Sequence, residues 1–253
     1  MAFYTNPRNL LLTLALTGLL SLSYVFGSTK AREQHKGYVY DPGGFFRGET
    51  DQKQLSLIFT GGEFGEGCVP ILDTLDRFEM KASFIVTGDF LREPENDVCL
   101  RRIVSEGHYL GPHSDTHPLY CSWDDRNKTL VTREFFVSDL KKNMVDLLAF
   151  GALPPGQKVY FIPPYEWFNR DQSRWAQSMN VILFNFTPGS GSNRDWAPSG
   201  HSAYASSDQI VGDVLDYERS DPRGLNGFLL LFHLGADRQD KVFSHLDRLI
   251  ERL

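Results

Sequence analysis

Histidines beside apolar runs are the residues of this chain best suited to chemistry. His113 and His117 are four residues apart, and one helical turn would place both imidazoles on the same face. A third, His233, directly follows the apolar run 228–232. Two imidazoles and one carboxylate, with open positions for water and substrate, form a common hydrolytic metal site. The spacing of the first two histidines therefore predicts such a site.

The elements that must position these histidines are short apolar runs alternating with amphipathic segments. Apolar runs typical of buried strands cover 55–60, 82–87, 109–111, 159–162, 181–186 and 228–232, and helical periodicity covers 69–80, 98–106, 135–150, 208–217 and 241–253. At least six such units predict a parallel sheet covered by helices and closed, or nearly closed, into a βα barrel. Reactive groups in such folds lie where strands end. No internal repeat or flexible linker divides residues 55–253, so one domain is expected.

Composition and the first residues bound the class of protein. The chain has 253 residues, 41% hydrophobic, with a net charge of -6, which excludes a disordered chain and argues against nucleic-acid binding. Residues 1–27 carry one charged side chain, Arg8, before an apolar run, and are predicted to be an export signal followed by a lead-in over 28–54 with one short edge strand. An uncleaved N-terminal anchor is the alternative. We expect a periplasmic or extracellular protein with no stable membrane insertion after cleavage.

The three cysteines, Cys68, Cys99 and Cys121, lack the spacing of a zinc site and define no disulfide framework. An exported location permits disulfides, but at least one thiol must stay free. None of the three lies at a predicted metal or catalytic position, so we expect them to affect stability rather than chemistry.

Three motifs carry a resemblance to a known family. The segment 113–117, His-Ser-Asp-Thr-His, resembles the H-[ST]-x-x-H motif of the polysaccharide deacetylases, the NodB-homology group of carbohydrate esterase family 4. Residues 229–233 resemble that family's closing strand motif, and 161–165 resemble its Arg-x-Pro-Tyr motif with Ile162 at the arginine. Order and spacing agree over about residues 55–250. The resemblance implies a distorted single-domain (β/α) barrel and removal of acetyl groups from sugars by a divalent metal, with zinc expected first and cobalt or nickel as alternatives.

The same resemblance implies roles for individual residues. His113 and His117 correspond to metal ligands, and His233 corresponds to the general acid that protonates the leaving group. Asp195 lies in a segment similar to the loop whose aspartate orients that histidine, although a solvated loop aspartate is the alternative. The backbone N–H of Tyr165 corresponds to the oxyanion donor. Besides Tyr165, the aromatic rings expected to stack on sugar, or else to pack the barrel rim, are those of Trp167 and Trp196.

The first motif departs from the family. Where the family has Phe-Asp-Asp-Gly, with a general base and then a metal ligand, this chain reads Phe-Thr-Gly-Gly-Glu over 59–63. A bacterial branch that the chain resembles carries Thr-Gly-Asp-Glu-Phe here, so that Gly62 replaces the base and Glu63 stands at the metal-ligand position. The other register puts Gly61 and Gly62 at both aspartates. We prefer the first, because it keeps a hard oxygen ligand beside two imidazoles.

A second departure is consistent with the first. The family's arginine holds the base carboxylate, so an arginine at Ile162 would have lost its partner when Gly62 replaced the base, and an unpaired buried charge is costly. The alternative is that Ile162 only extends the strand core. Asp115 and Glu166 are the remaining carboxylates able to replace the base, and we prefer a helix-capping role for Asp115.

The sequence thus predicts an exported, metal-dependent hydrolase that removes N-acetyl or O-acetyl groups from a polysaccharide or oligosaccharide. The competing hypothesis is a catalytically degenerate family member that binds glycan. The departures at Gly62 and Ile162 favour the binding module, whereas the retained histidines 113, 117 and 233 favour the enzyme.

Overall fold

The computed structural model describes residues 39–253. The predicted export signal over 1–27 lies outside this range, as does the first part of the lead-in. Residues 39–54 carry the strands β1 (Val39–Tyr40) and β2 (Phe45–Arg47), where one short edge strand was expected. Within the described residues, none of the helices has the length and apolar character needed to cross a membrane.

The main sheet has the order β1-β2-β8-β3-β4-β5. Four of its strands are parallel neighbours: β8 (Phe228–His233), β3 (Leu55–Gly61), β4 (Ser83–Val86) and β5 (Tyr109–Pro112). The antiparallel β2 extends the sheet at β8. A second parallel pair consists of β6 (Val159–Phe161) and β7 (Val181–Leu183). These strands are nearly continuous apolar runs because most are covered on both faces.

Two contacts curl the sheets around one interior. On one side, a parallel bridge joins Phe45, the first residue of β2, with Phe184 after β7, and the Asn185 N–H donates to the Phe45 carbonyl at 3.0 Å. On the other side a side chain replaces the strand ladder, because the Tyr109 hydroxyl accepts from the Tyr160 N–H (2.8 Å) and donates to the Tyr160 carbonyl (3.1 Å). The fold is therefore the distorted (β/α) barrel that the sequence predicted.

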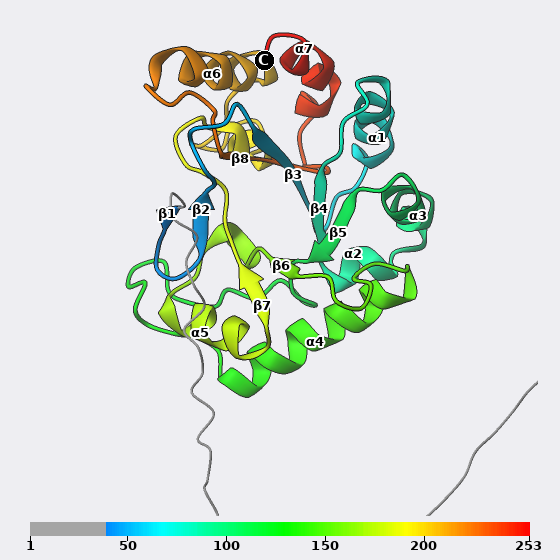
Figure 1. The fold of residues 1–253 in the computed structure, drawn as a ribbon, viewed down its shortest axis with the longest axis vertical. Coiled ribbons are helices and arrows are strands. Elements are labelled where there is room, and N and C mark those ends of the chain that lie inside the picture. Colours follow the sequence, from blue (N-terminus) through cyan, green and yellow to red (C-terminus); the bar gives the residue numbers. More distant parts are fainter. Residues whose placement is uncertain (1–38) are drawn as a thin grey trace, which may run out of the picture. The chain divides into compact units, whose positions relative to one another are not determined.

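Helices surround the strands (Figure 1). A large apolar cluster joins the main sheet to α1 (Cys68–Arg77), α3 (Asp97–Ser105), α6 (Ser207–Ser220) and α7 (Leu246–Ile250). A second cluster joins β6 and β7 to α4 (Arg133–Ala149) and α5 (Arg170–Ser178). The short α2 (Gly88–Arg92) follows β4. Neither α2 nor α5 was predicted, because α2 has only five residues and α5 is strongly polar.

The C-terminal segment is a correction to the sequence prediction. One helix was expected over 241–253, but a 3-10 turn, Val242–His245, precedes α7. The backbone of His245, with φ -118°, leaves the helical region and separates the two pieces.

The barrel interior is filled by an apolar cluster: Ile58, Ile85, Ile162, Phe184, Leu229 and Leu231. Ile162, which stands at the position of the family's arginine, is completely buried in this cluster. An aliphatic side chain suits that environment, because a guanidinium would be surrounded by apolar groups unless a carboxylate accompanied it.

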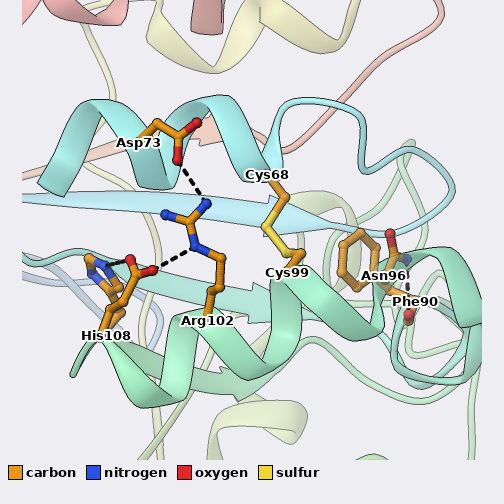
Figure 2. The surroundings of a disulfide bond; sticks show 8 residues. Cys68, Asp73, Phe90, Asn96, Cys99, Arg102 and His108 are labelled. Atoms are coloured by element: carbon orange, nitrogen blue, oxygen red, sulfur yellow. Dashed lines mark hydrogen bonds and ion pairs between the residues drawn. A yellow bond between two sulfur atoms is a disulfide. The ribbon is translucent and has the colours of Figure 1, made fainter.

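Cys68 at the start of α1 and Cys99 in α3 form a disulfide with a Cα–Cα distance of 6.0 Å (Figure 2). Beside it Arg102 bridges the two helices, with its guanidinium 2.7 Å from Asp73 and 2.6 Å from Glu106. Cys121 is buried and free. The sequence left this pairing open, and the fold decides it by placing α1 against α3.

Candidate active site

His113 and His117 follow β5 at the end of the parallel strands, and their ring centroids are 4.9 Å apart. The predicted helical turn is wrong, because residues 113–117 form an irregular loop. Ser114 and His117 have φ values of 72° and 53°, which a helix does not allow. The loop brings the rings together through a different backbone path.

Side chains hold this loop in place. Asp139 on α4 accepts hydrogen bonds from the N–H groups of Asp115 (3.0 Å) and Thr116 (3.2 Å), and the Ser114 hydroxyl accepts from the His117 N–H at 2.9 Å. These backbone N–H groups belong to no helix or strand, and each is thus satisfied by a side-chain acceptor. The histidine pair is consequently presented by a fixed loop.

Both imidazoles of the pair are neutral. His113 Nδ1 lies 2.8 Å from the Ile162 carbonyl, which can only accept, so Nδ1 carries the proton and Nε2 keeps a free lone pair. Burial lowers the pKa of His113 well below its usual value, and the adjacent His117 lowers it further. Burial, with a smaller effect of His233, lowers the pKa of His117 to about 4. Neutral imidazoles of this kind are ready to bind a metal ion.

His233 lies at the end of β8 and is held by Asp195. Its Nδ1–H donates to Asp195 Oδ1 at 2.7 Å, and its backbone N–H donates to Oδ2 at 2.8 Å. Burial by itself lowers the pKa of His233, but the charge and hydrogen bond of Asp195 outweigh it and raise that pKa. The structure thus contains the contact that the predicted orienting role of Asp195 requires.

Glu63 is not brought to the histidine pair. It lies in an exposed bend after β3, and its side chain makes no hydrogen bond or ion pair with residues 39–253. In the part of the chain that the structure describes, no three His, Cys, Asp or Glu side chains are already grouped closely enough to hold a metal ion.

The packing at Gly61 and Gly62 bears on the register of the first motif. A Cβ at Gly61 would lie 2.8 Å from Leu234 and 3.1 Å from Phe90, whereas one at Gly62 would meet only a methyl of Thr87 at 3.8 Å. A side chain at Gly61 would therefore require Leu234 and Phe90 to shift, whereas one at Gly62 is accommodated. This favours the register in which Gly62, and not Gly61, stands where the family has its base.

Glu166 is the carboxylate that the fold places beside the pair. Its side chain is 14% exposed, and its Oε1 lies 3.9 Å from His113 Nε2. Neither oxygen accepts a hydrogen bond from the described residues. Burial raises the pKa of Glu166 to about 7, opposed by nearby His233 and reinforced by Asp195. Glu166 is one of the two carboxylates that the sequence offered in place of the missing base, and the one for which no capping role was predicted.

Asp115 has a structural environment instead. Its side chain is 2% exposed, with one oxygen 2.6 Å from Arg92 Nη1 and the other 2.6 Å from Lys142 Nζ. Burial raises the pKa of Asp115, but the two cations outweigh it and hold the pKa below its ordinary value. The helix-capping role predicted for Asp115 is wrong, because no helix carries His117; the side chain instead ties α2 and α4 to the loop.

An aromatic surface extends outward from the histidine pair. The exposed Tyr165 ring lies 4.5 Å from His117 and 5.8 Å from Trp123, which stacks on Trp167 at 5.4 Å. The sequence predicted Tyr165 and Trp167 but missed Trp123, which is 56% exposed and follows no strand. Trp196, also exposed, packs against His201 instead.

Tyr165 and Glu166 share an unusual backbone. Both have positive φ values, 58° and 52°, and the Asn185 side chain donates to the Glu166 carbonyl at 2.6 Å. The hydrogen bonds that close this turn run from Glu166 to Pro163 and from Trp167 to Pro164. Neither of these hydrogen bonds involves the Tyr165 N–H, which is the predicted oxyanion donor.

The family follows from a comparison with known protein families. The model of the polysaccharide deacetylases matches residues 47–182, more than half of the 253 residues. The chain belongs to the polysaccharide deacetylase family. The matched region contains the histidine loop and the Pro-Pro-Tyr-Glu turn, whereas Asp195 and His233 lie beyond it.

Individual relatives agree with this family. A peptidoglycan-N-acetylglucosamine deacetylase of Bacillus cereus is 28% identical over 213 residues, which are 82% of this chain but only 66% of that protein. The fold is similar to PdaA of Bacillus subtilis, a family 4 carbohydrate esterase (TM-score 0.64, 20% identity, 83% of this chain and 78% of the other). It is equally similar to a family 4 pseudoenzyme of Bacillus anthracis (TM-score 0.62, 21% identity, 84% and 64%).

Proposed function

We propose that this protein is an exported, metal-dependent hydrolase that removes acetyl groups from an acetylated polysaccharide or oligosaccharide, at amide or ester bonds. The observation that carries the proposal is the meeting of a neutral histidine pair with the Asp195–His233 pair. Family membership supports the reaction class, since the peptidoglycan deacetylase of Bacillus cereus is among the relatives. The disulfide between Cys68 and Cys99 supports export, because such bonds persist in oxidising compartments.

The donor chemistry of the site fits a divalent metal such as zinc. His113 and His117 offer neutral imidazoles, and the first is oriented by a carbonyl behind it, as metal-binding histidines usually are. Glu166 adds a largely buried carboxylate that pairs with no Lys or Arg in residues 39–253. When bound, the metal would supply Lewis acidity toward the acetyl carbonyl and lower the pKa of water.

The remaining groups supply binding and proton transfer. His233, whose pKa is raised by its pairing with Asp195, can donate its Nε2 proton to the leaving nitrogen or oxygen. The Tyr165 N–H is the candidate donor to the developing oxyanion, and preorganised donors of this type contribute a large part of catalysis. The rings of Tyr165, Trp167 and Trp196 are the proposed stacking surfaces for sugar.

Acetate release from chitooligosaccharides and peptidoglycan fragments, with and without a chelator, tests the proposal. The native protein should show weak, metal-dependent release, because Gly62 supplies no base and a general base is worth about 10²–10⁴-fold in rate. His113→Ala and His233→Ala should abolish or strongly reduce release while the fold, monitored by circular dichroism, is kept. Release at an unchanged rate in His113→Ala would contradict the proposed site.

A double substitution tests the missing base. Gly62→Asp meets only Thr87 at the Cβ, and Ile162→Arg would supply the cation that holds the new carboxylate. Because either charge alone is unpaired, the double variant should release acetate faster than either single variant, and should also be more stable than Ile162→Arg.

The second candidate is a catalytically degenerate glycan-binding module, which the absence of side-chain chemistry at Gly62 and Ile162 favours. Binding of glycan without acetate release by either the native chain or the double variant would establish that reading.

A further inference from the structure

We infer that Glu166, and not Glu63, is the carboxylate that completes the metal site with His113 and His117. The inference rests on the metal dependence in the proposed function, and it moves the third ligand from the first family motif to the Pro-Pro-Tyr-Glu turn. No similarity of sequence leads to it, because the motif comparison points to Glu63.

The position of Glu63 argues against a ligand role. The side chain is exposed and makes no polar contact within residues 39–253, and the chain has already left β3 at Gly61. By contrast, His113 is buried with its lone-pair nitrogen turned toward Glu166. A ligand set that included Glu63 would require the bend after β3 to move toward the site.

The distance from Glu166 to His113 fits a shared ion. Two ligand atoms roughly 2.0–2.2 Å from one zinc lie about 3.4 Å apart at the tetrahedral angle and at most about 4.2 Å apart. The observed 3.9 Å between Glu166 Oε1 and His113 Nε2 lies within this span. A side-chain adjustment of roughly half an ångström brings this pair of ligand atoms to the tetrahedral value.

The charge of Glu166 also points to a cation. A buried carboxylate without hydrogen bonds or a counter-ion is costly, and native proteins normally pair it. Among the described residues Glu166 accepts no hydrogen bond and pairs with no Lys or Arg. Nearby His233 acts on it electrostatically, but the His233 imidazole is already bound to Asp195, whose charge has the same sign as that of Glu166. A divalent ion between Glu166 and the histidine pair would place an opposite charge in direct contact with the carboxylate.

The strained backbone of Tyr165 and Glu166 also supports a functional role for this turn. Tyr165 and Glu166 are successive non-glycine residues with positive φ, a conformation that costs of order 1–3 kcal/mol per strained residue and clusters at functional sites. The Asn185 side chain holds the turn through the Glu166 carbonyl. This conformation turns Glu166 inward, while Tyr165 stays exposed beside His117.

Metal binding, measured apart from activity, tests the inference. Metal-free protein, prepared by dialysis against a chelator, is titrated with ZnCl₂ by calorimetry, and with CoCl₂ to record the visible absorption of the bound ion. Glu166→Gln keeps the size of the side chain and should weaken zinc binding by at least about 100-fold, beyond the 10–100-fold typical of groups that only support a ligand. Glu63→Gln should stay within about twofold of the native protein, as should Glu251→Gln, an exposed control far along the chain.

Each outcome decides the inference. If Glu63→Gln loses zinc and Glu166→Gln does not, Glu63 is the ligand and the inference is wrong. Native-like zinc and cobalt titrations of Glu166→Gln, or no zinc binding by the native chain, also overturn it. If zinc binding depends on Glu166 but the native protein releases no acetate, the ligand assignment stands and the proposed function fails.

Discussion

Asp115, within the histidine loop, and Glu166, next to His113, are two carboxylates whose side chains are 2% and 14% exposed, and their surroundings differ. Each oxygen of Asp115 faces a cation, from Arg92 on one side and Lys142 on the other. Glu166 accepts no hydrogen bond and pairs with no Lys or Arg among residues 39–253; nearby His233 acts on it electrostatically, but Asp195 already binds that imidazole. Burial is common to both, so burial alone does not identify a functional group. Its two bound cations mark Asp115 as the residue that stabilises the loop, whereas Glu166, without such partners, is free to bind a ligand.

The same difference extends to the loops that carry them. The histidine loop has its N–H groups bonded to Asp139 and Ser114, with α2 and α4 tied to it through Asp115. The turn at Tyr165–Glu166 instead has two strained residues and an N–H, that of Tyr165, outside its closing hydrogen bonds. The histidine loop is fixed by its own hydrogen bonds and ion pairs, whereas the turn at Tyr165–Glu166 presents polar groups to which a ligand can bind.

The largest effect on the free energy of unfolding is expected from removal of the disulfide. This change is the reference for the comparison, because it should affect stability alone. Cys68→Ser with Cys99→Ser opens a cross-link of 31 residues and should lower the free energy of unfolding by about 2–4 kcal/mol. Zinc affinity should not change, because the bond lies between α1 and α3. Urea unfolding and zinc calorimetry measure the two quantities, and a loss of zinc affinity in folded protein would show that the site depends on the helix pair.

Replacing each carboxylate by its amide tests the comparison directly. Asp115→Asn removes a charge that two cations bind and should cost about 1–3 kcal/mol of unfolding free energy. Glu166→Gln removes an uncompensated charge, so the metal-free variant should be as stable as the native protein or slightly more stable. Urea unfolding of both variants without metal measures this, and a comparable loss in Glu166→Gln would assign that side chain a structural role.

The smallest effect is expected at His108, a buried histidine remote from the proposed metal site. Its Nδ1 accepts the Ala82 N–H at 3.1 Å, and burial, with Lys81, lowers the pKa of His108 below 6.5. The unfolded chain then binds a proton that the folded chain does not, so His108 reduces stability as the pH falls below about 6.5. His108→Gln should make the unfolding free energy less dependent on pH between about 7 and 5. An unchanged pH dependence would show that His108 is already protonated in the fold.

Much of the fold could be predicted from the sequence because its signals are local. Runs such as 55–60 and 228–232 are apolar at every position, and only a strand covered on both faces requires that. The histidine motif and the closing motif predicted the family, which the family comparison confirms. The pairing of Asp195 with His233 was also suggested by the similarity of the loop, and the contact is present.

Tertiary structure decided which carboxylate reaches the histidines, which cysteines pair and how the histidine loop is held. The motif comparison favoured Glu63, and the spacing of four residues favoured a helical turn at His113–His117. Both arguments rest only on residues that are near each other in the sequence. The direction of Glu63 depends on the bend after β3, and that of Glu166 on a strained turn held by Asn185 from another strand end. Periodicity and motif spacing report burial and residue type along the chain. The convergence of side chains after β5, β6 and β8 depends on contacts between residues far apart in the sequence, such as His113 and Ile162, 49 residues apart, and no local pattern encodes such contacts.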